Sequence, residues 1–122
     1  MPINKLFTPV ELKQISAAIE YIDKRYSETI SPDGLAIEVN MNIKQLQAGI
    51  QFITGLTIHN YQLRVRILKA KTDLEEFKDS IKTIAFKHGF SSPAHFSTEF
   101  KKQVGKSPKD FRFEILDKSK QS

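Results

Sequence analysis

The chain has 122 residues, no cysteine and a net charge of +5, and 39% of its residues are hydrophobic. This length suits one domain with a real hydrophobic core, and the lack of cysteine excludes disulfide bonds and thiolate metal sites, as expected in a reducing cytoplasm. Neither a long apolar run nor the apolar segment of a secretory signal is present, so we expect no transmembrane helix and no cleaved leader.

The basic charge is concentrated in the second half of the chain. Residues 1–60 carry five Lys or Arg against six Asp or Glu, whereas residues 61–122 carry fourteen against eight. A field of this kind attracts a polyanion such as nucleic acid. It is also typical of a solvated basic surface, so charge alone leaves both interpretations open.

Helix signals begin at Thr8, which is placed as the N-cap of a helix over residues 8–26. Glu11 follows three residues later, as in a capping box. Ser31, followed by proline, starts a short second helix, and Asn42 caps a third. The first half of the chain is therefore predicted to contain three helices.

Four further helices are predicted in the second half. Thr57 caps a long helix over residues 57–77. Three shorter helices follow, with their caps at Asp79 or Ser80, at Ser91 or Ser92, and at Ser107. The polar tail over residues 117–122 is expected to be frayed.

A weak internal repeat with a period of about 50 residues relates the two halves. Before the turn, Leu35-Ala36 corresponds to Ile84-Ala85. Beyond the turn the offset between the two copies grows by one residue. The corresponding pairs there are Leu46 with Phe96, Ile50 with Phe100 and Gly55 with Gly105. Between these anchors stand Asn40 and Gly89, both residue types that accept the left-handed backbone of a tight turn.

Each copy therefore consists of a short helix, a tight turn, a second helix and a glycine stop. This is the outline of a helix-turn-helix motif, whose second helix fits the major groove of DNA. An ordinary helical bundle built from duplicated hairpins is the alternative. Repeat and charge together favour DNA binding.

The stretch over residues 81–112 reads IKTIAFKHGFSSPAHFSTEFKKQVGKSPKDFR and resembles the C-terminal signature of the AraC/XylS family of transcriptional regulators. The matching residues are Ile81, Ile84, Ala85, Gly89, Phe90, Phe96, Phe100, Lys101, Gly105, Pro108 and Arg112. A looser match upstream comprises Leu35, Ala36, Leu46, Gly55, Tyr61, Arg66, Ala70 and Leu74.

The resemblance implies an all-α fold of seven helices with two homeodomain-like helix-turn-helix subdomains. These would cover residues 8–56 and 78–116, joined by the helix over 57–77 and followed by the tail over 117–122. The recognition helices would be residues 43–53 and 93–103, placed in successive major grooves of duplex DNA.

The candidates for base contact lie on the outward faces of these two helices. Gln can bond adenine, Lys can reach guanine or phosphate, and Ala or Thr can touch the thymine methyl group. The candidates are Lys44, Gln45, Gln47, Ala48, Gln51, Pro93, Ala94, His95, Ser97 and Thr98.

Phosphate contacts are expected from lysines and from helix N-termini. The candidates are Lys82, Thr83, Ser92, Lys101, Lys102, Lys106 and Lys109. The first recognition helix departs from the family pattern: Ala48 replaces a long side chain, Gly49 weakens the helix by roughly 1 kcal/mol, and Ile50 replaces the usual Phe. Direct reading by the first copy is therefore expected to be weak.

Other residues are given structural roles. Phe90, Phe96, Phe100 and Phe111 are assigned to the core; Arg66 and Arg112 fit either ion pairing or phosphate contact; and His88 is expected to end a helix. The three histidines lack metal-ligand spacing with carboxylates, and no glycine-rich phosphate loop is present, so no enzyme activity, metal or cofactor is expected.

The resemblance implies a sequence-specific regulator that binds a promoter and engages RNA polymerase in the bacterial cytoplasm, on the nucleoid. The module by itself is expected to be monomeric. A protein-interaction module on a decayed helix-turn-helix scaffold is the alternative. Because many family members carry a separate effector or dimerisation domain, a stand-alone regulator and a fragment of a longer one both stay open.

Overall fold

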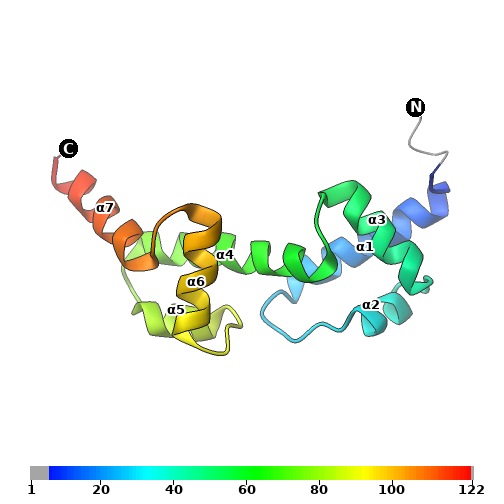
Figure 1. The fold of residues 1–122 in the computed structure, drawn as a ribbon, viewed down its shortest axis with the longest axis horizontal. Coiled ribbons are helices and arrows are strands. Elements are labelled where there is room, and N and C mark those ends of the chain that lie inside the picture. Colours follow the sequence, from blue (N-terminus) through cyan, green and yellow to red (C-terminus); the bar gives the residue numbers. More distant parts are fainter. Residues whose placement is uncertain (1–5, 122) are drawn as a thin grey trace. The chain divides into compact units, whose positions relative to one another are not determined.

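The computed structural model describes residues 6–121, and the side chains of residues 6–118. Seven α-helices and no strands occur in this described part of the chain, which confirms the all-α fold. The chain forms two compact units, residues 1–62 and 63–122, whose elements are coloured along the sequence in Figure 1.

The first unit contains three complete helices, each begun by a predicted capping residue. Thr8 accepts a hydrogen bond from the Glu11 amide while the Glu11 carboxylate accepts one from the Thr8 amide, so the capping box is confirmed. The Ser31 side chain accepts a hydrogen bond from the Gly34 amide, and the Asn42 side chain accepts one from the Lys44 amide. The helices are α1 (Pro9–Lys24), α2 (Pro32–Glu38) and α3 (Ile43–Thr54).

The core of the first unit is aliphatic. The buried side chains are Ile15, Ala18 and Ile22 from α1, Leu35 and Ala36 from α2, Leu46 and Ile50 from α3, and Ile58 from the start of the next helix, α4 (Ile58–Glu76). Gln62 is buried too, and its amide donates to the carbonyl oxygens of Tyr26 and Glu28 at 2.9 and 2.7 Å. These two bonds hold the segment between α1 and α2 against α4.

The second unit is built from most of α4 (Ile58–Glu76) and three more helices. Ser80, Ser92 and Ser107 each accept a hydrogen bond from a backbone amide three residues on, which resolves the predicted choices of capping residue. The helices are α5 (Ile81–Lys87), α6 (Pro93–Val104) and α7 (Pro108–Gln121).

A row of phenylalanines forms the centre of the second core. Phe90 and Phe96 have ring centroids 5.1 Å apart, Phe96 and Phe100 5.7 Å, and Phe100 and Phe111 5.5 Å. All four side chains are buried, so their assignment to the core is confirmed. Because α6 supplies Phe96 and Phe100, this row fixes the rotation of α6 about its own axis.

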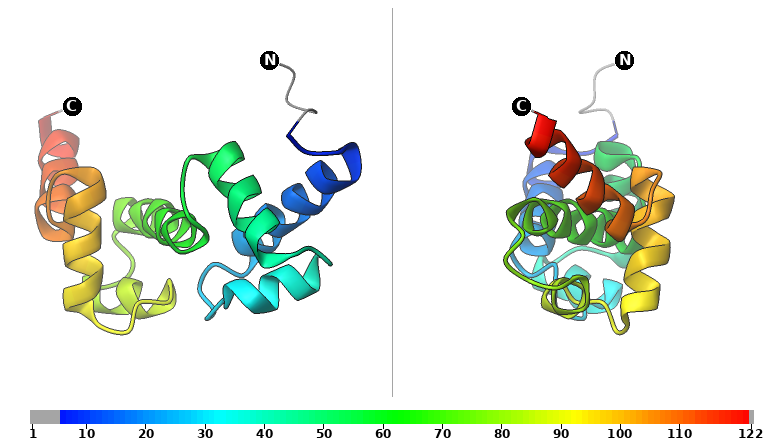
Figure 2. Two further views of the ribbon diagram at one scale, coloured as in Figure 1. Left: turned by 45° about the vertical axis from the view of Figure 1, so that its right-hand side comes forward. Right: turned by 90° about the vertical axis from the view of Figure 1, so that its left-hand side faces the viewer.

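The turn in each unit has the expected left-handed residue. Asn40 has φ 57° between α2 and α3, and Gly89 has φ 93° between α5 and α6. The two predicted recognition helices, α3 and α6, have twelve residues each and end at a left-handed glycine, Gly55 or Gly105. Figure 2 shows the same order of short helix, turn and longer helix in each unit, cyan to green and yellow-green to orange.

The structure continues α7 as far as Gln121, since the sequence there has no glycine or proline to end a helix. Fraying of this tail stays a prediction, and Ser122 lies outside the described residues. The predicted domain limits stay predictions, and the structure adds that α4 is shared between the units. No helix among the described residues is long and apolar enough to cross a membrane.

Candidate nucleic-acid interface

The outward face of α3 carries the predicted residues of the first unit. Leu46, Gly49 and Ile50 are buried, while the five base-contact candidates of this helix are exposed. Those five are Lys44, Gln45, Gln47, Ala48 and Gln51. The packing of α3 therefore leaves all five available to a ligand on the surface of the unit.

Gly49 has a packing role that the sequence did not reveal. A Cβ atom at this position would lie 2.4 Å from Cδ1 and 2.6 Å from Cγ1 of the buried Ile15. Real Cβ atoms essentially never approach so closely, so glycine is what allows α3 to lie against α1. The expected loss of helix stability at Gly49 is thus linked to a close helix–helix contact.

The three glutamines on α3 differ in their contacts. Gln45 donates to the Glu11 carboxylate at 3.1 Å, and Gln51 donates to the carbonyl oxygen of Gly55 at 3.0 Å. Gln47 has no hydrogen-bond partner among the described residues. Gln47 is therefore the amide of α3 whose donor and acceptor are both available without breaking an existing bond.

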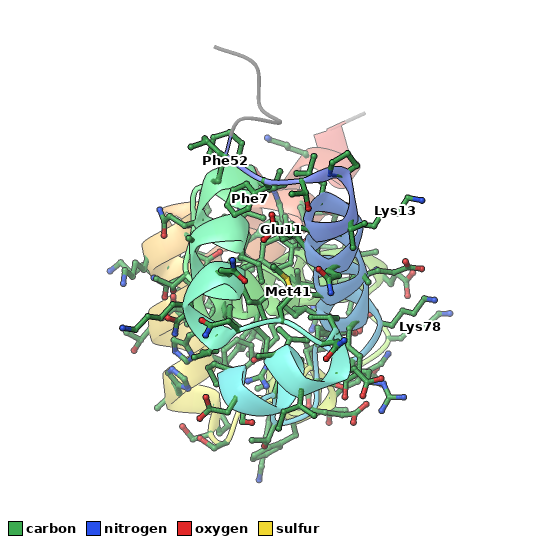
Figure 3. All side chains as sticks on the ribbon, turned by 90° about the vertical axis from the view of Figure 1, so that its right-hand side faces the viewer. Phe7, Glu11, Lys13, Met41, Phe52 and Lys78 are labelled. Atoms are coloured by element: carbon green, nitrogen blue, oxygen red, sulfur yellow. The ribbon has the colours of Figure 1, made fainter. Side chains whose placement is uncertain are left out.

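An apolar hollow of about 450 Å³ lies beside α3, between it and the beginning of α1. Its apolar floor includes Phe7 and Phe52, whose rings are 5.9 Å apart. Figure 3 shows these two side chains together, with Glu11 next to them. Neither Phe7 nor Phe52 was among the residues predicted from the sequence. The lining residues are Leu6, Phe7, Glu11, Lys44, Gln45, Ala48 and Phe52.

The outward face of α6 has short side chains at its centre and lysines at its end. Ala94, His95, Thr98, Lys101 and Lys102 are exposed. The other candidates on this helix, Pro93 and Ser97, are half-buried, as is the capping residue Ser92. The His95 ring stands edge-on to Phe90, with centroids 5.5 Å apart and planes at 78°. Phe90 thus supports His95 at the edge of the face.

The two recognition helices can be compared position by position, because their caps and buried residues correspond at an offset of 50 residues. Ala48 then corresponds to Thr98. Lys101 and Lys102 correspond to Gln51 and Phe52. Where α6 ends in two cations, α3 therefore has an amide and an aromatic ring. This difference in the sequence could have drawn attention to Phe52 as a surface residue.

The remaining phosphate candidates lie around helix beginnings in the second unit. Lys82, Thr83 and Lys109 are exposed. Lys106 is half-buried and forms an ion pair with Glu114, so it would have to exchange this partner to bind a phosphate. The second unit is the basic one, since residues 63–122 carry fourteen Lys or Arg against eight Asp or Glu.

Arg112 and Arg66, which both match family positions, donate hydrogen bonds to backbone carbonyl oxygens. Arg112 donates to the carbonyl oxygens of Leu74 and Asp79 at 3.1 and 2.7 Å, which joins the end of α4 to the start of α5. Arg66 donates to the carbonyl oxygen of Gly89 at 3.0 Å, in the turn before α6, and burial lowers the pKa of its guanidinium. Both arginines therefore brace the helix-turn-helix.

His88 ends α5 as predicted, and its buried side chain also pairs with the half-buried Asp73. Its Nε2 lies 2.6 Å from Oδ2 of Asp73 on α4, and Lys87 Nζ lies 3.0 Å from the same oxygen. No group of three His, Cys, Asp or Glu side chains suited to a metal ion occurs among the described residues.

Two capped helix-turn-helix units with exposed outer helices define a protein of the helix-turn-helix class. A family model described as a helix-turn-helix domain matches residues 35–113, which is more than half of the chain. The chain belongs to the AraC/XylS family of helix-turn-helix transcriptional regulators and corresponds to its DNA-binding domain.

Similar curated proteins are considerably longer than this chain. The HTH-type transcriptional activator RhaS of Pectobacterium atrosepticum is 33% identical over 108 residues, covering 88% of this chain and 39% of that protein. RhaS of Escherichia fergusonii is 31% identical over 99 residues, covering 81% of this chain and 36% of that protein. The chain thus spans under two-fifths of the length of these relatives.

Solved structures of AraC-type domains share the fold. A regulator from Chromobacterium violaceum with an AraC-type DNA-binding domain matches with a TM-score of 0.78 and 25% identity, covering 84% of this chain and 92% of its own. The DNA-binding domain of AdpA in complex with a target DNA matches with a TM-score of 0.81 over 88% of this chain and 97% of that one. The AdpA domain is 22% identical, so this likeness is one of fold.

Proposed function

We propose that the chain binds duplex DNA sequence-specifically, with α3 and α6 in successive major grooves, and thereby regulates transcription. The observation that carries the proposal is the pair of equivalent outward helices, each fixed by a buried core and each carrying polar side chains outside. The fold shared with a domain solved on its target DNA supports this placement. The comparisons do not favour the alternative of a protein-interaction module.

Base contacts are assigned to the exposed centres of the two helices. Gln47 is the strongest candidate of the first unit, because an unengaged amide can both donate to and accept from adenine. The full set is the one expected from the sequence, namely Lys44, Gln45, Gln47, Ala48, Gln51, Pro93, Ala94, His95, Ser97 and Thr98.

Phosphate contacts are assigned mainly to the second unit. Lys101 and Lys102 are exposed, and neither forms an ion pair within the described part of the chain. Their counterparts Gln51 and Phe52 carry no charge, so the second unit is expected to dominate the affinity. The other phosphate candidates are Lys82, Thr83, Ser92, Lys106 and Lys109.

The cellular setting is part of the same proposal. Regulators that resemble the RhaS activators would act at promoters in contact with RNA polymerase, in the cytoplasm and on the nucleoid. We expect this module to act as a monomer and without enzyme activity. The same proposal includes the boundaries of the two helix-turn-helix subdomains, 8–56 and 78–116, with the helix over 57–77 between them.

Fluorescence anisotropy with a labelled random duplex tests DNA binding itself. We expect binding at about 50 mM salt that weakens steeply by about 200 mM, because each phosphate contact releases counterions. Failure to bind at low salt, with the chain folded by circular dichroism, would refute the proposal and revive the protein-interaction alternative. Selection of bound duplexes from a random pool then gives the preferred sequence.

A further inference from the structure

The centre of the α6 face is a pair of methyl-bearing short side chains, Ala94 and Thr98. They are four residues apart and therefore lie on the same side of the helix, one turn from each other. Both are exposed, while Phe96 and Phe100 on the opposite side are buried in the core. Since the core fixes the rotation of α6, this pair points outward in the folded unit.

Longer side chains surround the pair but do not occupy its centre. Lys101 and Lys102 follow one turn later, and the His95 ring is placed at the edge by its contact with Phe90. Reading guanine in a bidentate way requires a long cationic donor, such as Arg or Lys. Ala94 and Thr98 are too short for this, although they allow the helix backbone to approach the base edges closely.

In the major groove, the group that matches a short apolar surface is the C5-methyl group of thymine. We propose, as a refinement that rests on the proposed function above, that the second unit reads thymine through the methyl groups of Ala94 and Thr98. Lys101 and Lys102 then hold the adjacent phosphates and set the register of the helix.

Thr98 has two groups that can meet a base. The hydroxyl can accept or donate a hydrogen bond, and it has no hydrogen-bond partner among the described residues. The methyl group can only make an apolar contact. Thr98→Ser keeps the hydroxyl and removes the methyl group, whereas Thr98→Val keeps a methyl group in the same place and removes the hydroxyl, so this pair of variants separates the two.

The experiment uses duplexes selected from a random pool, in which each thymine is replaced in turn by deoxyuridine. Uracil pairs like thymine and lacks the C5-methyl group. For the wild-type chain we expect a weakening of about fourfold at one or two positions, the value for one buried methyl group. At one of these positions Thr98→Ser should bind thymine and uracil equally, whereas Thr98→Val should still prefer thymine there.

Equal binding of the wild type to every thymine and uracil duplex would overturn the inference. So would a Thr98→Ser variant that keeps the full thymine preference at every position where the wild type shows one. Thermal melting checks that both variants are folded, as expected for an exposed position. These outcomes are distinct from failure of the proposed function, because a chain that does not bind DNA yields no selected duplex. Affinity that falls when 7-deazaguanine, which lacks the N7 acceptor, replaces guanine, but not when uracil replaces thymine, would refute thymine reading and leave DNA binding in place.

Discussion

Gly49 is the residue at which local preference and packing oppose each other most directly. Alanine is favoured over glycine in a helix interior by about 1 kcal/mol. At this position, however, a Cβ atom would overlap the buried Ile15 side chain. Gly49→Ala should therefore destabilise the chain by about 1–3 kcal/mol, as overpacking in a dense core does. Urea denaturation followed by circular dichroism measures the change.

Ile15→Val supplies the matched control, because it removes Cδ1, the Ile15 atom nearest to the place that the new methyl group would occupy. In a double-mutant cycle, Gly49→Ala should cost less in the Ile15→Val background than in the wild type. An equal cost in both backgrounds would show that overlap with Cδ1 of Ile15 is not the cause, since valine keeps the Cγ1 atom that lies 2.6 Å from the new Cβ atom.

Asp73 gives the second core a pH dependence. Burial raises the pKa of its carboxyl, but hydrogen bonds from His88 and Lys87 outweigh burial and hold the pKa below its ordinary value of 3.8. Because the folded-state pKa lies below the unfolded one, ionised Asp73 contributes its full stabilisation above about pH 5. That contribution is lost as the pH falls through the folded-state pKa.

Asp73→Asn should accordingly be less stable than the wild type at about pH 7, and the difference should shrink as the pH falls from about 5 to about 2. Free energies of unfolding measured in urea at several pH values give this comparison. A difference that is constant over the whole range would contradict the role given to the ionised carboxylate.

At the scale of single helices, α3 and α6 share length, caps and buried positions but differ in charge at their C-terminal turns. Phe52 of α3 stands where α6 has Lys102. Phe52→Lys should therefore strengthen DNA binding at low salt and steepen its salt dependence by about 0.9 in log–log slope, the value for one added phosphate contact. Anisotropy titrations at several salt concentrations measure both quantities.

The control for this variant is Phe52→Gln, which removes the same aromatic ring without adding charge. It should leave the salt slope at the wild-type value. If Phe52→Gln strengthens binding as much as Phe52→Lys, the gain comes from losing the contact between Phe7 and Phe52 rather than from a new phosphate contact.

Most of the helix boundaries could be predicted from the sequence, because capping residues and apolar spacing act within a few residues. Thr8, Ser31 and Asn42 begin their helices as expected, and the glycine stops are left-handed. The extent of α7 was not predicted, since polar composition indicated fraying although no residue there ends a helix.

Contacts between helices were less predictable, because they depend on how the helices cross. The bond between Glu11 and Gln45 and the pair of Asp73 with His88 join residues 34 and 15 positions apart. Periodicity along one helix carries no information on such partners. The family resemblance placed the outward faces, but the hollow beside Phe52 required the structure.

For the molecule as a whole, the two units differ in charge while sharing one architecture. Residues 1–62 carry five Lys or Arg against six Asp or Glu, and residues 63–122 carry fourteen against eight. Since phosphate contacts supply a large part of the affinity for DNA, the second unit is expected to provide most of the binding free energy. The first unit, whose direct reading of bases is expected to be weak, is expected to contribute less.

The larger contribution of the second unit to DNA affinity is tested most directly by comparing two double variants in one anisotropy assay with a selected duplex. Lys101→Ala with Lys102→Ala should weaken binding more than Lys44→Ala with Gln47→Ala. The first pair should also reduce the log–log salt slope by about 2, against about 1 for the second pair. The opposite order of affinities, or a salt slope unchanged by loss of Lys101 and Lys102, would contradict the claim that the second unit provides most of the binding free energy.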